Sequence, residues 1–321
     1  MTAPDTPLSP VSPLTPAAGD TLARERPASL WRDTLASILR QRSAVVGLAI
    51  LIFLVVVAVF APLIATHDPN QSLLGVEQGV LKREGSCIHA LGCPADQPEH
   101  IFGTDGNFRD VFSRVVFGAR TSLTIGFAAI AFAIILGTII GAVSGFLAGG
   151  VDTVAMRLMD VILAFPSLLL AIAIVTAAGR SLVNALLAIG IVSVPIYARV
   201  ARSAVLATRE ADFVTASRAL GESSLGILWR RILPNSLTPL VVQGTLGIGA
   251  AVLEIAALAF VGVTGDLSNA EWGSMIGLER NQLFSAPHII LAPGLAITLT
   301  VLGFNLLGDG LRDALDPRLN R

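Results

Sequence analysis

Residues 121–147 read TSLTIGFAAIAFAIILGTIIGAVSGFL and contain no charged side chain. An α-helix rises about 1.5 Å per residue, so this stretch as a helix is long enough to cross a hydrocarbon core about 30 Å thick. A soluble protein seldom has so long a run without a charged side chain for its surface. The stretch therefore predicts a transmembrane helix, and with it an integral membrane protein.

Five further segments have the length and apolarity of membrane spans. They lie near residues 44–66, 155–178, 181–205, 236–262 and 288–309. Of all 321 residues, 53% are hydrophobic and only 14% are charged, and the mean hydropathy is +0.74. An ordinary globular protein carries about 25% charged residues. The sequence thus predicts an all-α, polytopic integral membrane protein with six transmembrane helices.

Three residues inside the predicted spans affect their shape or surroundings. Pro166 in the third span and Pro195 in the fourth each lack a backbone N–H, so we expect kinks at both. Glu254 lies well inside the fifth span, where a carboxylate costs about 2.5–3.5 kcal/mol on insertion scales. It should therefore face protein or a wet cavity, either lining a translocation path or hydrogen-bonding to a neighbouring helix.

A regular glycine spacing marks the end of the second predicted span. Gly137, Gly141, Gly145 and Gly149 recur every four residues and would share one face of a helix. Small residues on one face let the backbone of another helix approach closely. We predict a helix-packing stripe at these four positions.

The placement of arginines predicts the orientation of the chain. With the N-terminus in the cytoplasm, most of the 22 Lys and Arg residues fall on the cytoplasmic side, as in most membrane proteins. Both termini are then cytoplasmic in a multi-pass protein of the cell membrane, with the loop at 263–287 outside. The predicted parts are a tail at 1–43 (disordered, then a surface helix over 29–41), a first span at 44–66, an extracytoplasmic loop at 67–119, a core at 120–310 with a cytoplasmic loop at 206–235, and a C-terminal tail at 311–321.

Several functional classes lack their residues in this sequence. A P-loop needs a glycine-rich turn before Lys, and the single lysine, Lys82, follows no such turn. The sequence has neither an HExxH motif nor a paired acid and base that would indicate a membrane enzyme. We therefore assign no catalytic residue, metal ligand or cofactor to this chain. A net charge of −1 without a basic face argues against nucleic-acid binding.

The polar segment 206–235 is long for a connection between two spans. Its first part is predicted to be helical, and Gly221 suits the end of that helix because glycine adopts positive φ without strain. A second helix is expected to begin at Ser223 or the next residue and to run to Pro234. Small side chains at 215–219 would let another protein approach this helical knob. A solvated hairpin without a partner is the alternative.

The spacing in this loop resembles the EAA loop of ABC-importer permeases, E-A-A-x3-G-x9-I-x-L-P. The positions that correspond are Thr215, Ala216, Ser217, Gly221, Leu233 and Pro234. Thr215, Ser217 and Arg231 depart from the residues of the pattern, whereas the glycine and the Leu-Pro pair keep to it. The resemblance implies an ATPase-coupling surface that also includes Asp212, Arg218 and Ala219.

Other segments narrow the resemblance. EWGSM at 271–275 and FNLLGDGLRD at 304–313 are similar to the C-type permease subunit of dipeptide and oligopeptide importers, and the similarity covers roughly residues 30–320. It implies a type I ABC-importer permease fold in a complex of several chains. The implied partners are a homologous second permease, two subunits that bind ATP and Mg²⁺, an extracytoplasmic substrate-binding protein and the lipid bilayer.

The resemblance implies ATP-driven import of dipeptides or oligopeptides with alternating access. Within the same family, an importer of nickel or another small solute is the nearest alternative. A secondary transporter or channel that works alone is a different class. It would need intramembrane charges for ion coupling, and Glu254 is the one carboxylate deep in a predicted span.

Cys87 and Cys93 are the only cysteines, and both fall in the predicted external loop. Cysteines outside the cell tend to pair, so we expect a disulfide, with free thiols as the remaining option. His89 and His100 flank the cysteines, so a zinc site is a further alternative, although the spacing matches no strong zinc pattern.

Overall fold

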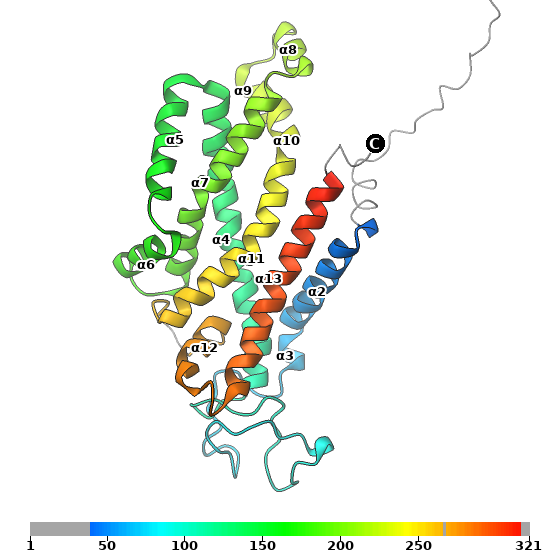
Figure 1. Ribbon diagram of the computed structural model, residues 1–321, viewed down its shortest axis with the longest axis vertical. Helices are drawn as coiled ribbons and strands as arrows, with labels where there is room; N and C mark the ends of the chain where they lie inside the picture. The colour runs from blue at the N-terminus through cyan, green and yellow to red at the C-terminus, as the bar shows by residue number, and fades with distance from the viewer. Residues whose placement is uncertain (1–38, 266–267, 316–321) are drawn as a thin grey trace, which may run out of the picture.

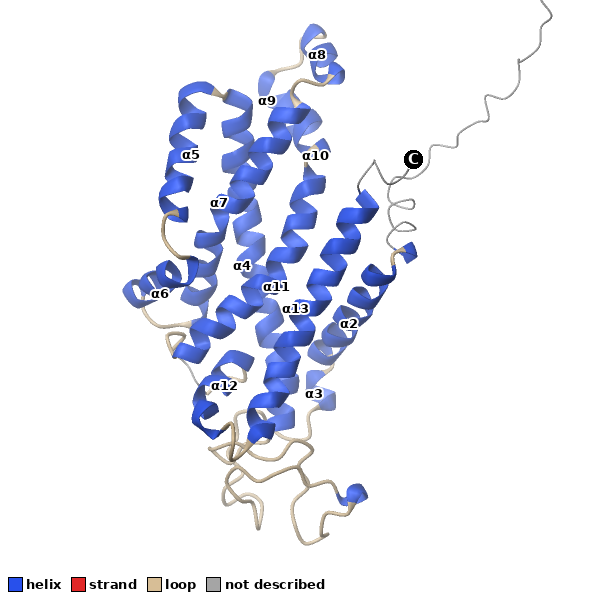
Figure 2. Ribbon diagram, viewed as in Figure 1, coloured by secondary structure: helices blue, strands red, loops and turns tan. Residues whose placement is uncertain are grey.

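The structure is a computed structural model that describes residues 39–265 and 268–315. Within these ranges it is a bundle of helices without a strand (Figure 1, Figure 2). Residues 1–38 of the predicted N-terminal tail, with nearly all of its surface helix, and residues 316–321 of the C-terminal tail lie outside the described residues.

Five helices in the described ranges are long and apolar enough to cross a membrane, or six if the bent pair α5 and α6 counts as one span. The long helices are α2 (Arg42–Val59), α4 (Val111–Leu147), α7 (Leu182–Thr208), α11 (Leu237–Val261) and α13 (Pro287–Leu315), and the bent pair is α5 (Gly149–Leu163) and α6 (Ser167–Ala178). The shorter elements are α3 (Ala61–Ile64), α8 (Asp212–Ala219), α9 (Ser224–Gly226), a π-helical turn (Ile227–Ile232), α10 (Leu233–Asn235), α12 (Trp272–Glu279) and two 3-10 turns (His89–Leu91 and Arg280–Gln282).

The third span is not the single helix predicted at 155–178. Helix α5 ends at Leu163, α6 begins at Ser167, and the two helices meet at 90°. Pro166 lies at the break with a ψ of 126°, outside the helical range. A proline cannot donate the helical hydrogen bond, and it disfavours helical geometry in the residue before it. The expected kink is therefore a full break of the span.

Three other predicted boundaries also differ from the structure. The span at 44–66 divides at Phe60, whose φ and ψ of −89° and 13° separate α2 from α3, and Pro62 lies in the first turn of α3. Helix α4 begins at Val111, inside the predicted loop 67–119, because the Asp110 carboxylate accepts a hydrogen bond from the N–H of Ser113 at 2.7 Å. The last helix runs to Leu315, beyond the predicted end of the core.

Helices α4 and α7 form the central pair of the bundle. A Cβ on Gly137 would lie 2.6 Å from the Cβ of Tyr197, and one on Gly145 would lie 2.9 Å from the carbonyl oxygen of Arg202. The structure thus places Gly137, Gly141 and Gly145 directly against the backbone of α7. Close approach needs these glycines because any larger side chain would hold the helices apart.

Gly149 does not belong to this stripe, and its inclusion was wrong. Helix α4 ends at Leu147, and Ala148 and Gly149 turn the chain into α5 with φ of 55° and 62°. A Cβ on Gly149 would meet no atom within 4 Å. The four-residue spacing continues past the end of the helix, so it no longer defines a face there.

The two ends of the bundle carry different structures. Figure 1 shows α8 projecting at one end and the long segment between α3 and α4 covering the other. On the flank, α13 packs against α2 and α11. Large apolar side chains such as Phe53 (60% exposed) and Phe127 (62% exposed) point outward, as expected for a surface that lipid covers.

Candidate functional site

Residues 210–235, which we call the α8 knob, carry the α8 helix that projects from one end of the bundle (Figure 1). Helix α8 buries Val214 and Ser217 and exposes the side chains between and beyond them. The Ser217 hydroxyl donates to the carbonyl of Phe213 at 2.9 Å. The exposed positions include Asp212, Thr215, Ala216, Arg218 and Ala219. Five of the residues predicted for the coupling surface thus lie on the open face of α8.

Gly221 ends α8 in a paired hydrogen-bond motif. Its φ is +80°, its N–H donates to the carbonyl of Arg218 at 3.0 Å, and the N–H of Glu222 donates to the carbonyl of Ser217 at 3.1 Å. These are the two bonds of a Schellman motif, which needs a residue with positive φ at this place. The sequence-based expectation for Gly221 is observed.

The second half of the knob begins with a cap and is anchored in the bundle. The Ser223 hydroxyl accepts from the N–H of Gly226 at 3.2 Å, as an N-cap does. Ile227, Leu228 and Ile232 are buried with Val214 against Val205 of α7. Leu233 and Pro234 follow in α10, and Pro234 is exposed. An apolar base therefore fixes the knob, while its α8 face stays open.

Two arginines next to the base of the knob connect α7 and its end to α4 and α5. Arg209, just after α7, donates to the carbonyl of Gly145 on α4 at 3.0 Å. Arg202 on α7 forms a two-bond pair with Asp152 on α5, at 2.5 and 2.6 Å, and the Ser144 hydroxyl donates to the same carboxylate. These contacts join α4, α5 and α7 beside the base of the knob.

Glu254 on α11 faces the break between α5 and α6. Its Oε1 accepts a hydrogen bond from the hydroxyl of Ser167, the first residue of α6, at 3.4 Å. The side chain is partly exposed. The contact fits a helix-packing role, and the partial exposure is compatible with a place beside a translocation path.

Comparison with known proteins assigns this arrangement to a family. Residues 133–321 match the family described as the inner membrane component of binding-protein-dependent transport systems, and residues 29–79 match the N-terminal transmembrane domain of oligopeptide transport permease C. The dipeptide transport system permease protein DppC of Alkalihalophilus pseudofirmus is 44% identical over 296 residues, 91% of each chain. The chain belongs to the binding-protein-dependent transport permeases.

Two more comparisons describe this permease. It is 39% identical to the di/tripeptide transport system permease protein DppC of Pseudomonas aeruginosa, over 95% of this chain and 96% of the other. A structure of the MetNI methionine ABC transporter in an inward-facing conformation superposes with a TM-score of 0.52 at 18% identity, covering 64% of this chain and 98% of that one. The permease thus has the type I ABC-importer fold, and its family is one of transport components.

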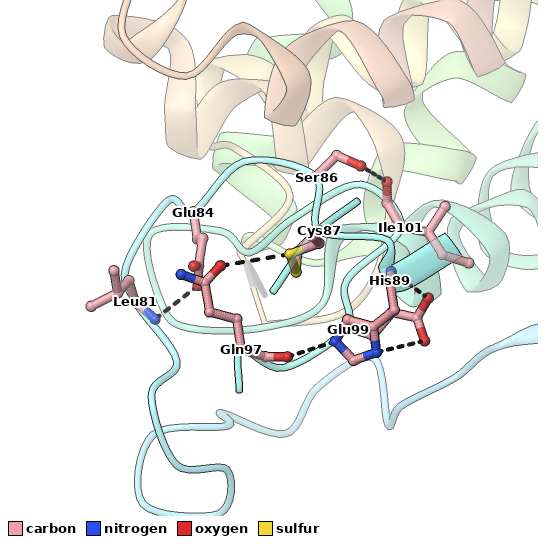
Figure 3. The surroundings of a disulfide bond; sticks show 9 residues. Leu81, Glu84, Ser86, Cys87, His89, Gln97, Glu99 and Ile101 are labelled. Carbon is pink, nitrogen blue, oxygen red and sulfur yellow. Dashed lines mark hydrogen bonds and ion pairs between the residues drawn. A yellow bond between two sulfur atoms is a disulfide. The ribbon is translucent and has the colours of Figure 1, made fainter. Parts of the chain in front are cut away.

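The loop between α3 and α4 of the permease carries the Cys87–Cys93 disulfide (Figure 3). The backbone of Cys87 pairs with that of His100, with N–H to carbonyl distances of 2.9 and 2.8 Å. His89 turns away from this pairing, because its Nε2 lies 2.8 Å from the carbonyl of Gln97. The two histidines that flank the cysteines therefore face different surroundings.

We predict that the disulfide is present in the purified permease. Denaturation and alkylation without reductant should leave Cys87 and Cys93 unmodified, and reduction should expose both to the reagent. Closing so short a loop with a disulfide should stabilise its folded form over the unfolded chain by about 2 kcal/mol in the chain-entropy picture. Mass spectrometry of the peptides checks the prediction. Two alkylated thiols in the unreduced sample would contradict it.

Two acidic groups, one before α12 and one before α4, are held by specific contacts. Burial raises the pKa of Glu271, which caps α12 by accepting from the N–H groups of Gly273 and Ser274 at 2.9 and 2.7 Å. Burial acts to raise the pKa of Asp110 as well, but hydrogen bonds from His100 and Ser113 outweigh it and lower that pKa. These capping hydrogen bonds thus fix the first turns of α12 and α4.

Sequence reasoning missed the polar groups that depend on tertiary contacts. It did not pair Asp152 with Arg202, which are 50 residues apart. It also did not bring together His67, Glu77 and His100, which the structure places around one point. A carboxylate and an arginine inside apolar helices could have suggested the first pair. No local pattern marks the second group.

Proposed function

We propose that this permease carries dipeptides or oligopeptides across the cell membrane as one subunit of an ATP-driven importer. The single observation that carries the mechanism is the α8 knob, whose small-residue face is open while its base is anchored to α4 and α7. The two relatives described above are named as dipeptide and di/tripeptide permeases, which supports a peptide substrate. Membership of a binding-protein-dependent family speaks against a transporter or channel that works alone.

The proposed complex contains several chains. A homologous second permease would complete the translocation path, two ATP-binding subunits would contact the α8 knobs, and a binding protein would deliver substrate outside. ATP and Mg²⁺ would bind to the partner subunits and not to this chain. Purification of the tagged permease from its native cells should retain these chains. A permease that transports peptides when isolated alone would overturn the proposal.

The proposed coupling step follows the contacts at the base of the knob. Movement of α8 by an ATP-binding subunit would act on Arg209 and Arg202, whose partners lie on α4 and α5. Ser167, at the break between α5 and α6, is hydrogen-bonded to Glu254 on α11. Such a movement would therefore also change how α6 packs against α11. Rigid-body motion of packed helices in this way would alternate the access of the path.

Substrate class is tested by uptake in cells that lack the permease gene. Restoring the wild-type chain should restore accumulation of a labelled dipeptide, and an excess of unlabelled dipeptide should compete. A matched measurement with radioactive nickel should show no change. Restored nickel uptake without dipeptide uptake would favour the other cargo of the family and contradict the peptide proposal.

We predict that the knob is cytoplasmic and that the loop between α3 and α4 is extracytoplasmic. In a background of Cys87→Ser and Cys93→Ser, a cysteine at the exposed Asp96 should react in intact cells with a maleimide that cannot cross membranes. A cysteine at the exposed Ser224 should react only after permeabilisation. Ala270 is unsuitable as an outside position because it is only 5% exposed. Labelling of position 224 in intact cells would contradict contact with an intracellular ATPase.

A further inference from the structure

Four side chains from separate parts of the permease converge below the start of α4. His67 follows α3, Glu77 and His100 come from the loop, and Asp110 is the N-cap of α4. Nε2 of His67 lies 2.9 Å from Oε1 of Glu77, and Nε2 of His100 lies 3.3 Å from Oε2 of Glu77. Nδ1 of His100 lies 3.0 Å from Oδ1 of Asp110. The two imidazole rings thus face one carboxylate.

Two of these atoms are buried without a hydrogen-bond partner. They are Nε2 of His100, a residue that is 1% exposed, and Oε2 of Glu77. Although the two atoms lie 3.3 Å apart, their geometry is not that of a hydrogen bond. A buried polar atom that is left unpaired costs about 1–3 kcal/mol. Both atoms instead face the same small space, in which a bound cation would contact both of them.

The distances suit a tetrahedral cation. One ligand atom each from His67, Glu77 and His100 can be chosen so that all three lie within 4.8 Å of one another. With bonds of about 2.0–2.1 Å to nitrogen and oxygen, neighbouring ligands of tetrahedral zinc lie about 3.3–3.4 Å apart. The spacing between His100 and Glu77 already equals that value. Small shifts of the partly exposed His67 and Glu77 complete the set.

The surrounding contacts orient the rings as metal ligands. Asp110 accepts from Nδ1 of His100, which leaves the lone pair of Nε2 directed at Glu77. Nδ1 of His67 lies 2.9 Å from the hydroxyl of Thr66, which leaves its Nε2 toward the same carboxylate. A carboxylate that holds the far nitrogen of a ligating histidine is a regular feature of zinc sites.

We propose that His67, Glu77 and His100 bind a zinc-class divalent cation on the extracytoplasmic side, with water as the fourth ligand. Two imidazoles and one carboxylate are a donor set for zinc, whereas calcium and magnesium take oxygen ligands. The cysteines supply no ligand because both are in the disulfide. The proton between His67 and Glu77 is displaced when the cation binds.

The cation would join three parts of the chain at the end opposite the α8 knob. His67 lies after the first span, Asp110 begins α4, and His100 is paired through its backbone to the disulfide residue Cys87. A cation bound by His67, Glu77 and His100, with Asp110 holding the ring of His100, ties the loop to the start of α4. This is the end of the bundle at which the binding protein of the proposed importer would dock. This role is independent of the substrate and of the coupling at the knob.

Zinc binding is measured on the purified complex with the full-length permease. Chelator treatment is followed by equilibrium dialysis against zinc and by elemental analysis of the protein. Wild type should bind about one zinc ion per permease at this site. His89→Gln is the matched control, because His89 lies in the same loop outside the cluster, and it should bind zinc as wild type does.

Variants of the cluster should lower the zinc affinity in a defined order. Asp110→Asn keeps a capping side chain and should weaken binding by about 10–100-fold, the usual effect of losing an outer partner. Glu77→Gln and His67→Gln remove ligands and should weaken it further. His67 is 20% exposed, so its variant tests the site if His100→Gln fails to fold.

Cobalt provides a readout that needs no variant. Cobalt bound to wild type in place of zinc should give the visible absorption of a tetrahedral site, and zinc should abolish that absorption by competition. Wild-type protein that binds neither metal would overturn the proposal and leave a hydrogen-bonded His–Glu cluster. Equal binding by wild type, Glu77→Gln and His67→Gln would also overturn it, because the cation would then bind elsewhere.

Discussion

Gly221→Asp is expected to abolish most peptide uptake while the permease remains inserted in the membrane. A Cβ at this position would meet no atom within 4 Å, so the substitution creates no clash. The φ of +80° is a strained region for most residues, but aspartate tolerates it better than most. The fold of the bundle should therefore survive. The new carboxylate lies beside the 88% exposed Leu220, on the surface that we propose contacts an ATP-binding subunit.

The size of the effect follows from desolvation. Burying an uncompensated charge in an interface costs about 3–5 kcal/mol. Since 1.4 kcal/mol is a factor of ten, docking should weaken by about 100-fold or more. Uptake of labelled dipeptide, normalised to the amount of permease in the membrane, measures the loss. ATPase activity in the purified complex should become insensitive to substrate.

Gly149→Asp is the matched control for this experiment. Gly149 also has positive φ, is exposed, and has no atom within 4 Å of its Cβ position. It begins α5, and α5 starts at the same end of the bundle as α8 (Figure 1). The same substitution there should leave uptake near that of wild type. Normal uptake by Gly221→Asp at equal abundance would contradict the coupling role, as would an equal loss in both variants.

The membrane spans were predictable because apolarity over 20 or more residues is a local property of the sequence. The run at 121–147 lies inside α4, and the runs at 181–205 and 236–262 agree with α7 and α11 to within a few residues. The break at Pro166 was only partly predictable. Proline explains why the helix is interrupted, but the 90° between α5 and α6 depends on what each helix packs against.

The α8 knob was predictable for a similar reason. A glycine after a helix and a serine before one act through hydrogen bonds to residues two to five positions away, so Gly221 and Ser223 identify the two helix ends without tertiary information. The contacts that anchor the knob are different. The bond from Arg209 to Gly145 spans 64 residues, and nothing near either residue in the sequence indicates it.

The glycine stripe shows the limit of pattern reasoning within one element. Spacing alone identified Gly137, Gly141 and Gly145 as a close-packing face, and the structure supplies the partner, α7. Including Gly149 in the stripe because of the same spacing was wrong. Helix α4 had ended two residues earlier, at Leu147, and the positive φ of Ala148 and Gly149 turns the chain into α5.

Gly141→Leu is expected to disrupt the bundle itself. A Cβ on Gly141 would lie 2.2 Å from the carbonyl oxygen of Ala198, 2.8 Å from the Cβ of Ala201 and 2.9 Å from the amide nitrogen of Arg202. Two of these three atoms are backbone, so a rotamer change cannot relieve the contact. Helices α4 and α7 must separate, at a cost of about 3 kcal/mol, the upper end of the range for overpacked cores.

The separation should reach the knob as well. Arg202 and Arg209 join α7 to α5 and α4, and their bonds depend on the spacing between the helices. We therefore expect both a loss of folded complex, measured by size-exclusion chromatography of detergent extracts, and a loss of uptake by the remainder. In this respect Gly141→Leu differs from Gly221→Asp, which should spare the fold.

Gly294→Leu separates packing from the general effect of replacing a glycine in a span. Gly294 lies in α13, and a Cβ there would meet no atom within 4 Å. Both substitutions gain helix propensity by a similar amount, about 1 kcal/mol, so that contribution cancels in the comparison. The Gly294 variant should yield as much folded complex as wild type. If Gly141→Leu is tolerated equally well, α4 and α7 are not in backbone contact at this point, and the central pair of the bundle is assigned wrongly.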